Sequence, residues 1–152
     1  MEFGKPGYTA QIAAYLQNRD YLKAYSLAKE FTVKFPDEMS AHFLLSQSAF
    51  WLGRYDEAAW EGSKAFNKAS AEEDMVSCAI TAASAYYGGK RYSEGFAILK
   101  FAENRKKTAN IETMLFMCSL AMNNGREAAT HLNELYCLNK KAAEEMAVRY
   151  LK

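Results

Sequence analysis

The sequence predicts an all-α protein, a right-handed α-α superhelix of about four antiparallel helix pairs followed by a C-terminal capping helix. Only two prolines, Pro6 and Pro36, interrupt 152 residues, so helix can run through most of the chain. Apolar residues recur at helical spacing along long stretches. A short polar break followed by a similar residue pattern also recurs at nearly regular intervals, which indicates an internal repeat.

The breaks define the repeat. Tyr21, Tyr55 and Tyr92 each follow a short polar break, and Gly125 takes the equivalent place in a weaker fourth copy. The spacings between these residues are 34, 37 and 33, so we expect an insertion of three residues near 71–74. In the second break, Gly53 is expected to end one helix and open a tight turn, across which Tyr55 packs back.

Each break separates two expected helices. The first helices of the pairs are expected at about 8–17, 40–52, 75–88 and 111–122, and the second helices at about 21–34, 55–69, 92–105 and 126–138. A small residue follows three places after each break residue, at Ala24, Ala58, Gly95 and Ala128. Such residues allow two helix axes to approach to about 8–10 Å.

This pattern resembles the tetratricopeptide repeat (TPR) family, in which a helix pair recurs every 34 residues. Residues 39–72 carry the family pattern best, at Leu45, Ser46, Gly53, Tyr55, Ala58 and Ala65, and residues 5–38 keep Tyr21, Ala24, Ala28 and Pro36. Phe31 at a usually small site and Ser70 at a usual proline site depart from it. The resemblance implies one domain over 1–152, with repeats at about 5–38, 39–72, 76–108 and 109–141. Residues 141–152 would then form the capping helix.

In this family the concave face comes from the first helix of each pair. Carried over to this chain, the resemblance implies a partner-binding groove at Ala13, Leu16, Phe43, Gln47, Phe50, Trp51, Ile80, Ser84 and Tyr87. Chaperone-binding members hold an acidic peptide tail with basic and amide side chains in the groove, a clamp that is absent here. The aromatic side chains instead favour an amphipathic helix or an extended apolar peptide as the partner. For Phe50 and Tyr87, a place in the core is the alternative.

Other functions find little support in the sequence. A net charge of +1 disfavours nucleic-acid binding, no apolar run is long enough to span a membrane, and the N-terminus lacks a signal-peptide pattern. We find no nucleophile elbow, no phosphate-binding glycine pattern, and no ligand spacing around His42 or His131. We therefore expect no catalytic residue, no cofactor, no metal site and no small-molecule substrate.

The cysteines bear on the compartment. Cys78, Cys118 and Cys137 form an odd set without paired spacing, in apolar helical stretches. We expect buried, reduced thiols and hence an intracellular protein of the cytoplasm or nucleus.

The leading hypothesis is a non-enzymatic protein-interaction scaffold that also self-associates. The run from Tyr21 to Trp60 resembles the N-terminal modules of TPR subunits of the anaphase-promoting complex, a cell-cycle ubiquitin ligase, and this resemblance implies a homodimer. The alternative resemblance is to bacterial type III secretion chaperones, which hold a hydrophobic peptide. The sequence leaves open whether the groove takes a twin chain or another protein, which partner and organism are involved, and whether the chain is full-length.

Overall fold

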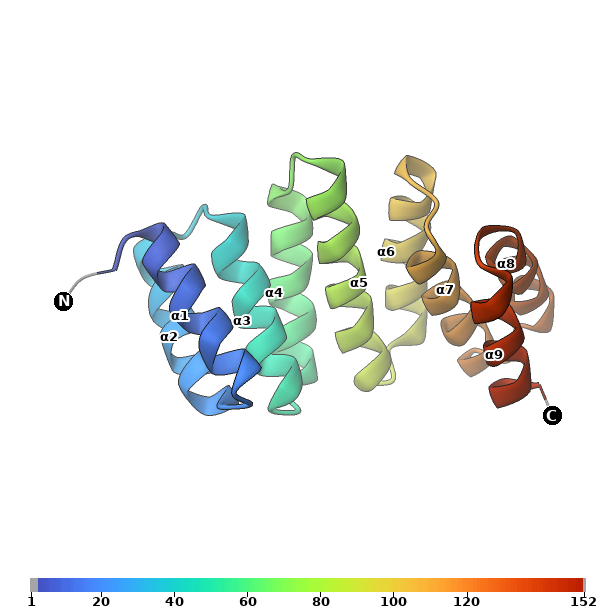
Figure 1. The fold of residues 1–152 in the computed structure, drawn as a ribbon, viewed down its shortest axis with the longest axis horizontal. Helices are drawn as coiled ribbons and strands as arrows, with labels where there is room; N and C mark the ends of the chain where they lie inside the picture. The colour runs from blue at the N-terminus through green and yellow to red at the C-terminus, as the bar shows by residue number, and fades with distance from the viewer. Residues whose placement is uncertain (1–2, 152) are drawn as a thin grey trace.

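The structure, a computed structural model, describes residues 3–151 and contains helices joined by short turns (Figure 1). Within this range nine helices follow one another without a strand. They are α1 (Lys5–Gln17), α2 (Tyr21–Lys34), α3 (Met39–Trp51), α4 (Tyr55–Lys68), α5 (Glu72–Gly88), α6 (Tyr92–Arg105), α7 (Ala109–Ala121), α8 (Gly125–Leu138) and α9 (Lys140–Tyr150).

The predicted fold class is confirmed, and the helices begin and end close to the expected positions. The expected insertion near 71–74 takes the form of extra helix. Helix α5 has 17 residues where α1, α3 and α7 have 13, and it begins at Glu72. The added residues therefore extend α5 at its start and leave the turn before α6 unchanged in length.

The turns inside the four pairs share one backbone shape. Arg19, Gly53, Lys90 and Asn123 have φ angles of 59°, 76°, 63° and 61°, and they are the only described residues with positive φ. In each turn the next residue donates its N–H to the carbonyl five places back, as Arg54 does to Ala49 at 2.9 Å. This hydrogen bond and the left-handed residue before it form the Schellman motif that ends helices. Only one of the four left-handed residues is glycine, so the break recurs as a conformation and not as a residue type.

Small residues allow neighbouring helices to approach closely. Ala24, Ala58, Gly95 and Ala128 are all buried, as their spacing predicts. The closest approach is at Gly62 on α4, where an added Cβ would lie 2.9 Å from the Cα of Ala82 on α5. A side chain at this position would push two backbones apart.

Tyr55 also depends on a missing side chain. A Cβ at Gly88 would lie 2.6 Å from its ring, so the tyrosine lies flat over the end of α5. It also meets Phe50 edge-on, with ring centroids 5.6 Å apart. Tyr55 therefore connects its own turn to the following helix pair.

The odd-numbered helices form the inner layer of the array. The backbone of each of α1, α3, α5 and α7 lies close to that of the next odd-numbered helix, whereas successive even-numbered helices in the described part of the chain meet only through side chains, such as Tyr25 and Glu57. The array therefore curves with the odd-numbered helices on the concave side, and the two layers are visible in Figure 1. Helix α9 covers the last pair, burying Ala143 and Met146 and placing the Tyr150 ring 6.1 Å from that of Phe116.

A polar contact links the first two pairs. The hydroxyl of Tyr25 on α2 donates to the Glu57 carboxylate on α4, at 2.7 and 2.9 Å from its two oxygens. Lys29 Nζ lies 2.8 Å from Glu57 Oε2. Burial raises the pKa of Glu57, but the hydrogen bonds from Lys29 and Tyr25 outweigh burial and bring it below its ordinary value of 4.5.

We expect Gly53→Ala to lower the free energy of unfolding by about 1 kcal/mol, because alanine is strained at positive φ. No atom lies within 4 Å of the added Cβ, so the loss would come from the backbone alone. Lys90→Gly, at the equivalent turn, should raise stability by about 0.5–1 kcal/mol. Urea denaturation measures both changes in the free energy of unfolding. If both variants changed stability in the same direction, this account of the turns would be contradicted.

We expect Tyr25→Phe to lower the free energy of unfolding by about 1.5 kcal/mol at pH 7, because it removes a hydrogen bond to a charged carboxylate. Since the folded-state pKa of Glu57 is lowered, its stabilising contribution is complete above pH 4.5 and is lost as the pH falls below that value. The difference between wild type and variant should therefore shrink at pH 3.5. A difference independent of pH would mean that the hydroxyl acts without the carboxylate charge.

Candidate functional site: the inner groove

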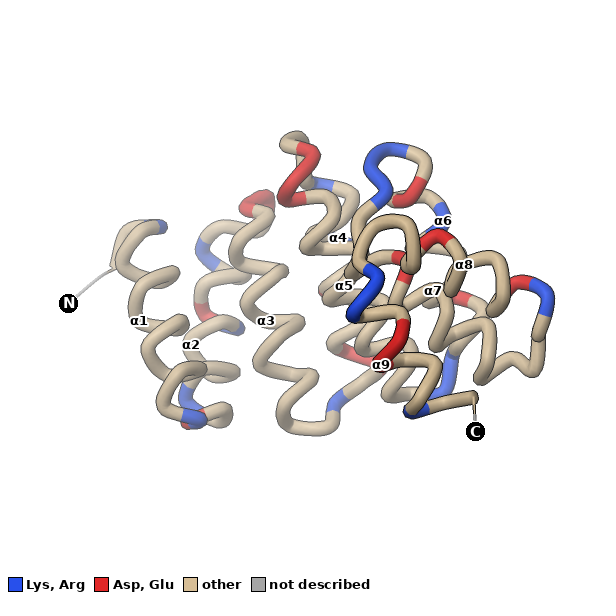
Figure 2. Tube along the Cα trace, turned by 45° about the vertical axis from the view of Figure 1, so that its right-hand side comes forward, with Lys and Arg blue, Asp and Glu red and all other residues tan. Residues whose placement is uncertain are grey.

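The inner layer carries little charge over its first three helices. Helix α3 has no Lys, Arg, Asp or Glu, and α1 has only Lys5. The charges of α5 are confined to its first turn, at Glu72, Glu73 and Asp74. Figure 2 shows this difference, since the coloured segments lie mainly at helix ends, on the outer helices and on α9. The inner surface of α1, α3 and α5, called the inner groove below, is thus apolar or uncharged polar over most of its length.

The first hollow of the inner groove has a volume of about 270 Å³ and lies between α1, α3 and α5. It is lined by Thr9, Met39, Ser40, Phe43, Leu44, Asp74, Ser77 and Cys78. The Cys78 thiol is 3.6 Å from the sulfur of Met39. Burial, with a further contribution from Asp74, raises the pKa of Cys78 to about 12, so the thiol stays neutral and contributes a soft apolar wall.

The second hollow has a volume of about 170 Å³ and lies further along the same two helices, α3 and α5. It is lined by Gln47, Phe50, Trp51, Ile80, Thr81 and Ser84. Trp51 is 58% exposed, although one face of its ring stacks on Tyr21 with centroids 5.4 Å apart. A large aromatic side chain that is fixed in position and still open to solvent is well suited to contact a partner.

The structure brings together six of the nine groove residues expected from the sequence. Phe43 lines the first hollow, and Gln47, Phe50, Trp51, Ile80 and Ser84 line the second. Ala13 is exposed on α1, and Leu16 is half-buried against the core under α1 and α3. Tyr87 packs against the core between α5 and α7, where burial raises its pKa, as do Tyr150 and Tyr92.

Sequence reasoning missed part of the lining. Met39, Cys78 and Thr81 do not occupy positions that the family pattern assigns to the concave face, so that pattern gave no signal for them. Asp74 lies on the additional first turn of α5, whose location depends on how the insertion folds. Its carboxylate places one negative charge at the rim of an otherwise uncharged groove.

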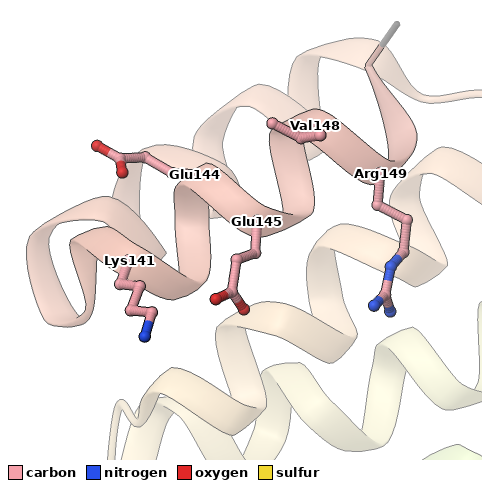
Figure 3. Close-up of a pocket in the computed structure, with 5 residues that line it drawn as sticks. All are labelled: Lys141, Glu144, Glu145, Val148 and Arg149. Atoms are coloured by element: carbon pink, nitrogen blue, oxygen red, sulfur yellow. The ribbon is translucent and has the colours of Figure 1, made fainter.

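A larger hollow, of about 650 Å³, lies on α9 (Figure 3). All of its lining residues come from this one helix, and Figure 3 shows Lys141, Glu145 and Arg149 pointing to one side and Glu144 pointing away. Four of the five lining side chains are charged and long. Because no second helix supplies convergent groups, this surface offers a partner less fixed shape than the inner groove.

The histidines have different surroundings. His42 is a buried structural residue, with Nδ1 2.6 Å from Glu61 Oε2 and Nε2 2.7 Å from the carbonyl oxygen of Pro36. His131 lies four residues after Glu127 on α8, and the fold also places Glu103 and Glu112 beside it. Burial and the neighbouring Glu103 raise the pKa of Glu112. The hydrogen bond with His131 lowers it, but the net pKa stays above its ordinary value. Burial also raises the pKa of Glu103, but hydrogen bonds with Glu112 and Lys100 lower it overall.

The expectation for the thiols is wrong for one cysteine. Cys78 and Cys118 are buried, but Cys137, near the end of α8, is exposed. Helix α8 is an outer helix whose last three residues, Tyr136, Cys137 and Leu138, are exposed, although Leu135 just before them is buried. An apolar stretch in an outer helix therefore does not bury every residue in it.

Comparison with known proteins identifies the fold. No protein-family profile and no curated protein matches the sequence. Among solved structures, a point mutant of MamA has a TM-score of 0.73 at 15% identity, with 90% of this chain and 78% of that chain covered. MamA of MSR-1 has a TM-score of 0.72 at 16% identity, with 92% of this chain and 79% of that chain covered. A thermophilic TPR protein of Thermus thermophilus has a TM-score of 0.67 at 17% identity, with 95% of this chain and 78% of that chain covered. The chain therefore has a TPR-like fold.

None of the helices over residues 3–151 is both long enough and apolar enough to cross a lipid bilayer.

We expect a thiol-reactive dye at pH 8 to label Cys137 alone in the native protein. Cys78 and Cys118 are buried, and burial raises their pKa values to about 12 and about 11, so they present neither access nor thiolate. Mass spectrometry of the labelled chain should show one label in buffer and three in denaturant. Rapid native labelling of Cys78 would mean that the first hollow opens in solution.

Proposed function

We propose that the protein is a non-catalytic protein-interaction scaffold whose inner groove binds an apolar face of a helix or an apolar peptide. The observation that carries this proposal is the exposure of Trp51 in the second of two hollows along the inner groove, whose only charged lining residue among those described is Asp74. The TPR-like fold supports the proposal, because stacked helix pairs present an extended concave surface suited to elongated partners.

The shape and chemistry of the groove favour a helical or extended segment over a small molecule. Both hollows lie along α3 and α5, and each is smaller than the 300–1,000 Å³ that drug-sized ligands usually occupy. Anchoring side chains at intervals along a segment would fill the two hollows separately. The half-exposed rings of Phe43 and Phe50 would lose water on binding, which is the main source of the affinity.

The lack of charge argues against a nucleic acid as the partner, since phosphate contacts need clustered Lys or Arg side chains. It also argues against acidic peptide tails, because Gln47 and Ser84 stand where a carboxylate clamp needs cations. A cytoplasmic or nuclear location remains part of this proposal, because the neutral, reduced thiols Cys78 and Cys118 suit a reducing compartment.

The two sequence resemblances predict different occupants. A subunit similar to those of the anaphase-promoting complex would place a second copy of this chain in the groove. A chaperone similar to those of type III secretion would hold a segment of a different protein. Self-association of the purified chain separates these two forms of the proposal, because only the first predicts a dimer without any other component.

We expect Trp51 to report occupancy of the groove. The chain has two tryptophans, Trp51 on α3 and Trp60 on the outer helix α4. The Trp60 side chain is 64% exposed. In Trp60→Phe, the emission of Trp51 should shift to shorter wavelength as an amphipathic helical peptide, selected by display against the chain, is added. The same shift should appear on concentration alone if the chain dimerises through the groove.

Trp51→Glu should weaken binding of the selected peptide by at least about tenfold, because a buried aromatic anchor carries a large share of interface energy. Trp60→Glu is the matched control, since it changes an equally exposed tryptophan outside the groove, and it should leave affinity within about twofold. Circular dichroism verifies that both variants keep their helicity. Equal losses in the two variants, or none in either, would reject the groove as the binding site.

A further inference from the structure

Three helices of the C-terminal half each direct one polar side chain to a common buried point. These side chains are Glu103 of α6, Glu112 of α7 and His131 of α8, and one potential ligand atom from each lies within 4.8 Å of the other two. His131 Nδ1 is 2.8 Å from Glu112 Oε1 and 3.5 Å from Glu103 Oε2. His131 is 1% exposed, Glu112 is 0% exposed, and the Glu103 side chain is 10% exposed.

The second helix pair provides an internal comparison. His42 is the fourth residue of α3 and Glu61 the seventh of α4, while Glu112 is the fourth residue of α7 and His131 the seventh of α8. The two histidine–glutamate pairs thus occupy the same helix positions in opposite order, and each spans 19 residues. The His42 pair is complete, because Pro36 accepts at Nε2 and Lys64 donates to Glu61.

The His131 pair differs in two ways. A second carboxylate, that of Glu103, joins it from the preceding helix pair. In addition, Glu112 Oε2 is buried and finds no hydrogen-bond partner among residues 3–151, and His131 Nε2 makes no hydrogen bond although Glu127 Oε2 lies 3.3 Å away. A structural hydrogen-bonded pair of the kind seen at His42 needs neither the added carboxylate nor the unpartnered Glu112 oxygen, and a buried oxygen of this kind requires a compensating group.

We propose that Glu103, Glu112 and His131 form a binding site for a divalent transition-metal ion, with Zn²⁺ as the best fit. Two ionised carboxylates and one neutral imidazole balance the charge of such an ion. Zinc accepts both imidazole nitrogen and carboxylate oxygen ligands and can be held by three protein ligands, whereas Ca²⁺ takes six to eight oxygens and Mg²⁺ favours oxygen ligands over imidazole.

The existing distances need little adjustment to accept the ion. Tetrahedral zinc with ligand bonds of about 2.0–2.2 Å holds its ligand atoms about 3.3–3.6 Å apart. The separation of His131 Nδ1 from Glu103 Oε2 is already 3.5 Å, and that from Glu112 Oε1 must open from 2.8 Å. Lys100 holds the other oxygen of Glu103 at 2.8 Å, so it fixes this carboxylate without occupying the oxygen that faces the histidine.

The far side of the imidazole also suits metal binding. Glu127 Oε2 lies 3.3 Å from His131 Nε2, which places a carboxylate next to the nitrogen that must keep its hydrogen when Nδ1 binds the ion. Metal-binding histidines usually direct their second N–H to such an outer carboxylate. The ion would join α6, α7 and α8, and so connect the third helix pair to the fourth.

Zinc titration by calorimetry on the intact chain tests the proposal. All proteins carry Cys137→Ser, because the exposed thiol of Cys137 can itself bind zinc. We expect one equivalent of Zn²⁺ to bind with micromolar affinity or better and to raise the thermal unfolding midpoint. Glu112→Gln and His131→Gln should each weaken binding at least about tenfold. Glu61→Gln, at the matched position of the second pair, should bind like the parent.

Two further readouts keep the test decisive. If Glu112→Gln fails to fold by circular dichroism, Glu103→Gln replaces it, because that side chain lies at the edge of the cluster and is partly exposed. Co²⁺ should give the visible absorption of a tetrahedral nitrogen and oxygen site in the parent and not in His131→Gln. Absence of stoichiometric binding by the parent, or undiminished binding in folded Glu103→Gln and His131→Gln, would overturn the proposal.

Discussion

The rest of this structure depends on how closely the backbones of neighbouring helices approach each other. At Gly62 the backbones of α4 and α5 approach so closely that a single Cβ would lie 2.9 Å from a neighbouring Cα. The backbones of successive inner helices lie close together, while successive outer helices in the described part of the chain meet only through side chains. Curvature follows from this difference in contact, and the concave surface follows from curvature. The inner groove therefore exists because side chains are small or missing at a few helix crossings.

Much of the fold could be predicted from the sequence, because helix pairs leave local signals. Tyr21, Tyr55 and Tyr92 begin second helices where the spacing predicted, and the buried residues three places later are small. The turn conformation could not be predicted residue by residue. Arg19, Lys90 and Asn123 adopt the left-handed conformation that glycine prefers, because the hydrogen bonds on either side hold them there. The family pattern likewise located the insertion but not the helical turn that it adds.

The site divides in the same way. Phe43 and Trp51 could be placed on the inner surface from the sequence, because their position in a repeated helix decides which way they face. Cys78 and Asp74 could not, since their place in the lining depends on the added turn and on the closeness of α3 to α5. The cluster around His131 left no sequence signal beyond Glu127, four residues earlier on the same helix. Its carboxylates come from two other helices, and only tertiary packing brings them together.

The opposite order of the two histidine–glutamate pairs also bears on how the chain avoids pairing its helices wrongly. Repeated helices are similar enough for one to dock in the place of another during folding. Docking α3 on α8 would oppose His42 to His131, and docking α7 on α4 would oppose Glu112 to Glu61. Each wrong pairing would bury two histidines or two glutamates against each other, whereas each correct pairing buries a histidine against a glutamate. The two pairs thus distinguish otherwise similar helices by their chemistry, and they favour the correct assembly over a shuffled one.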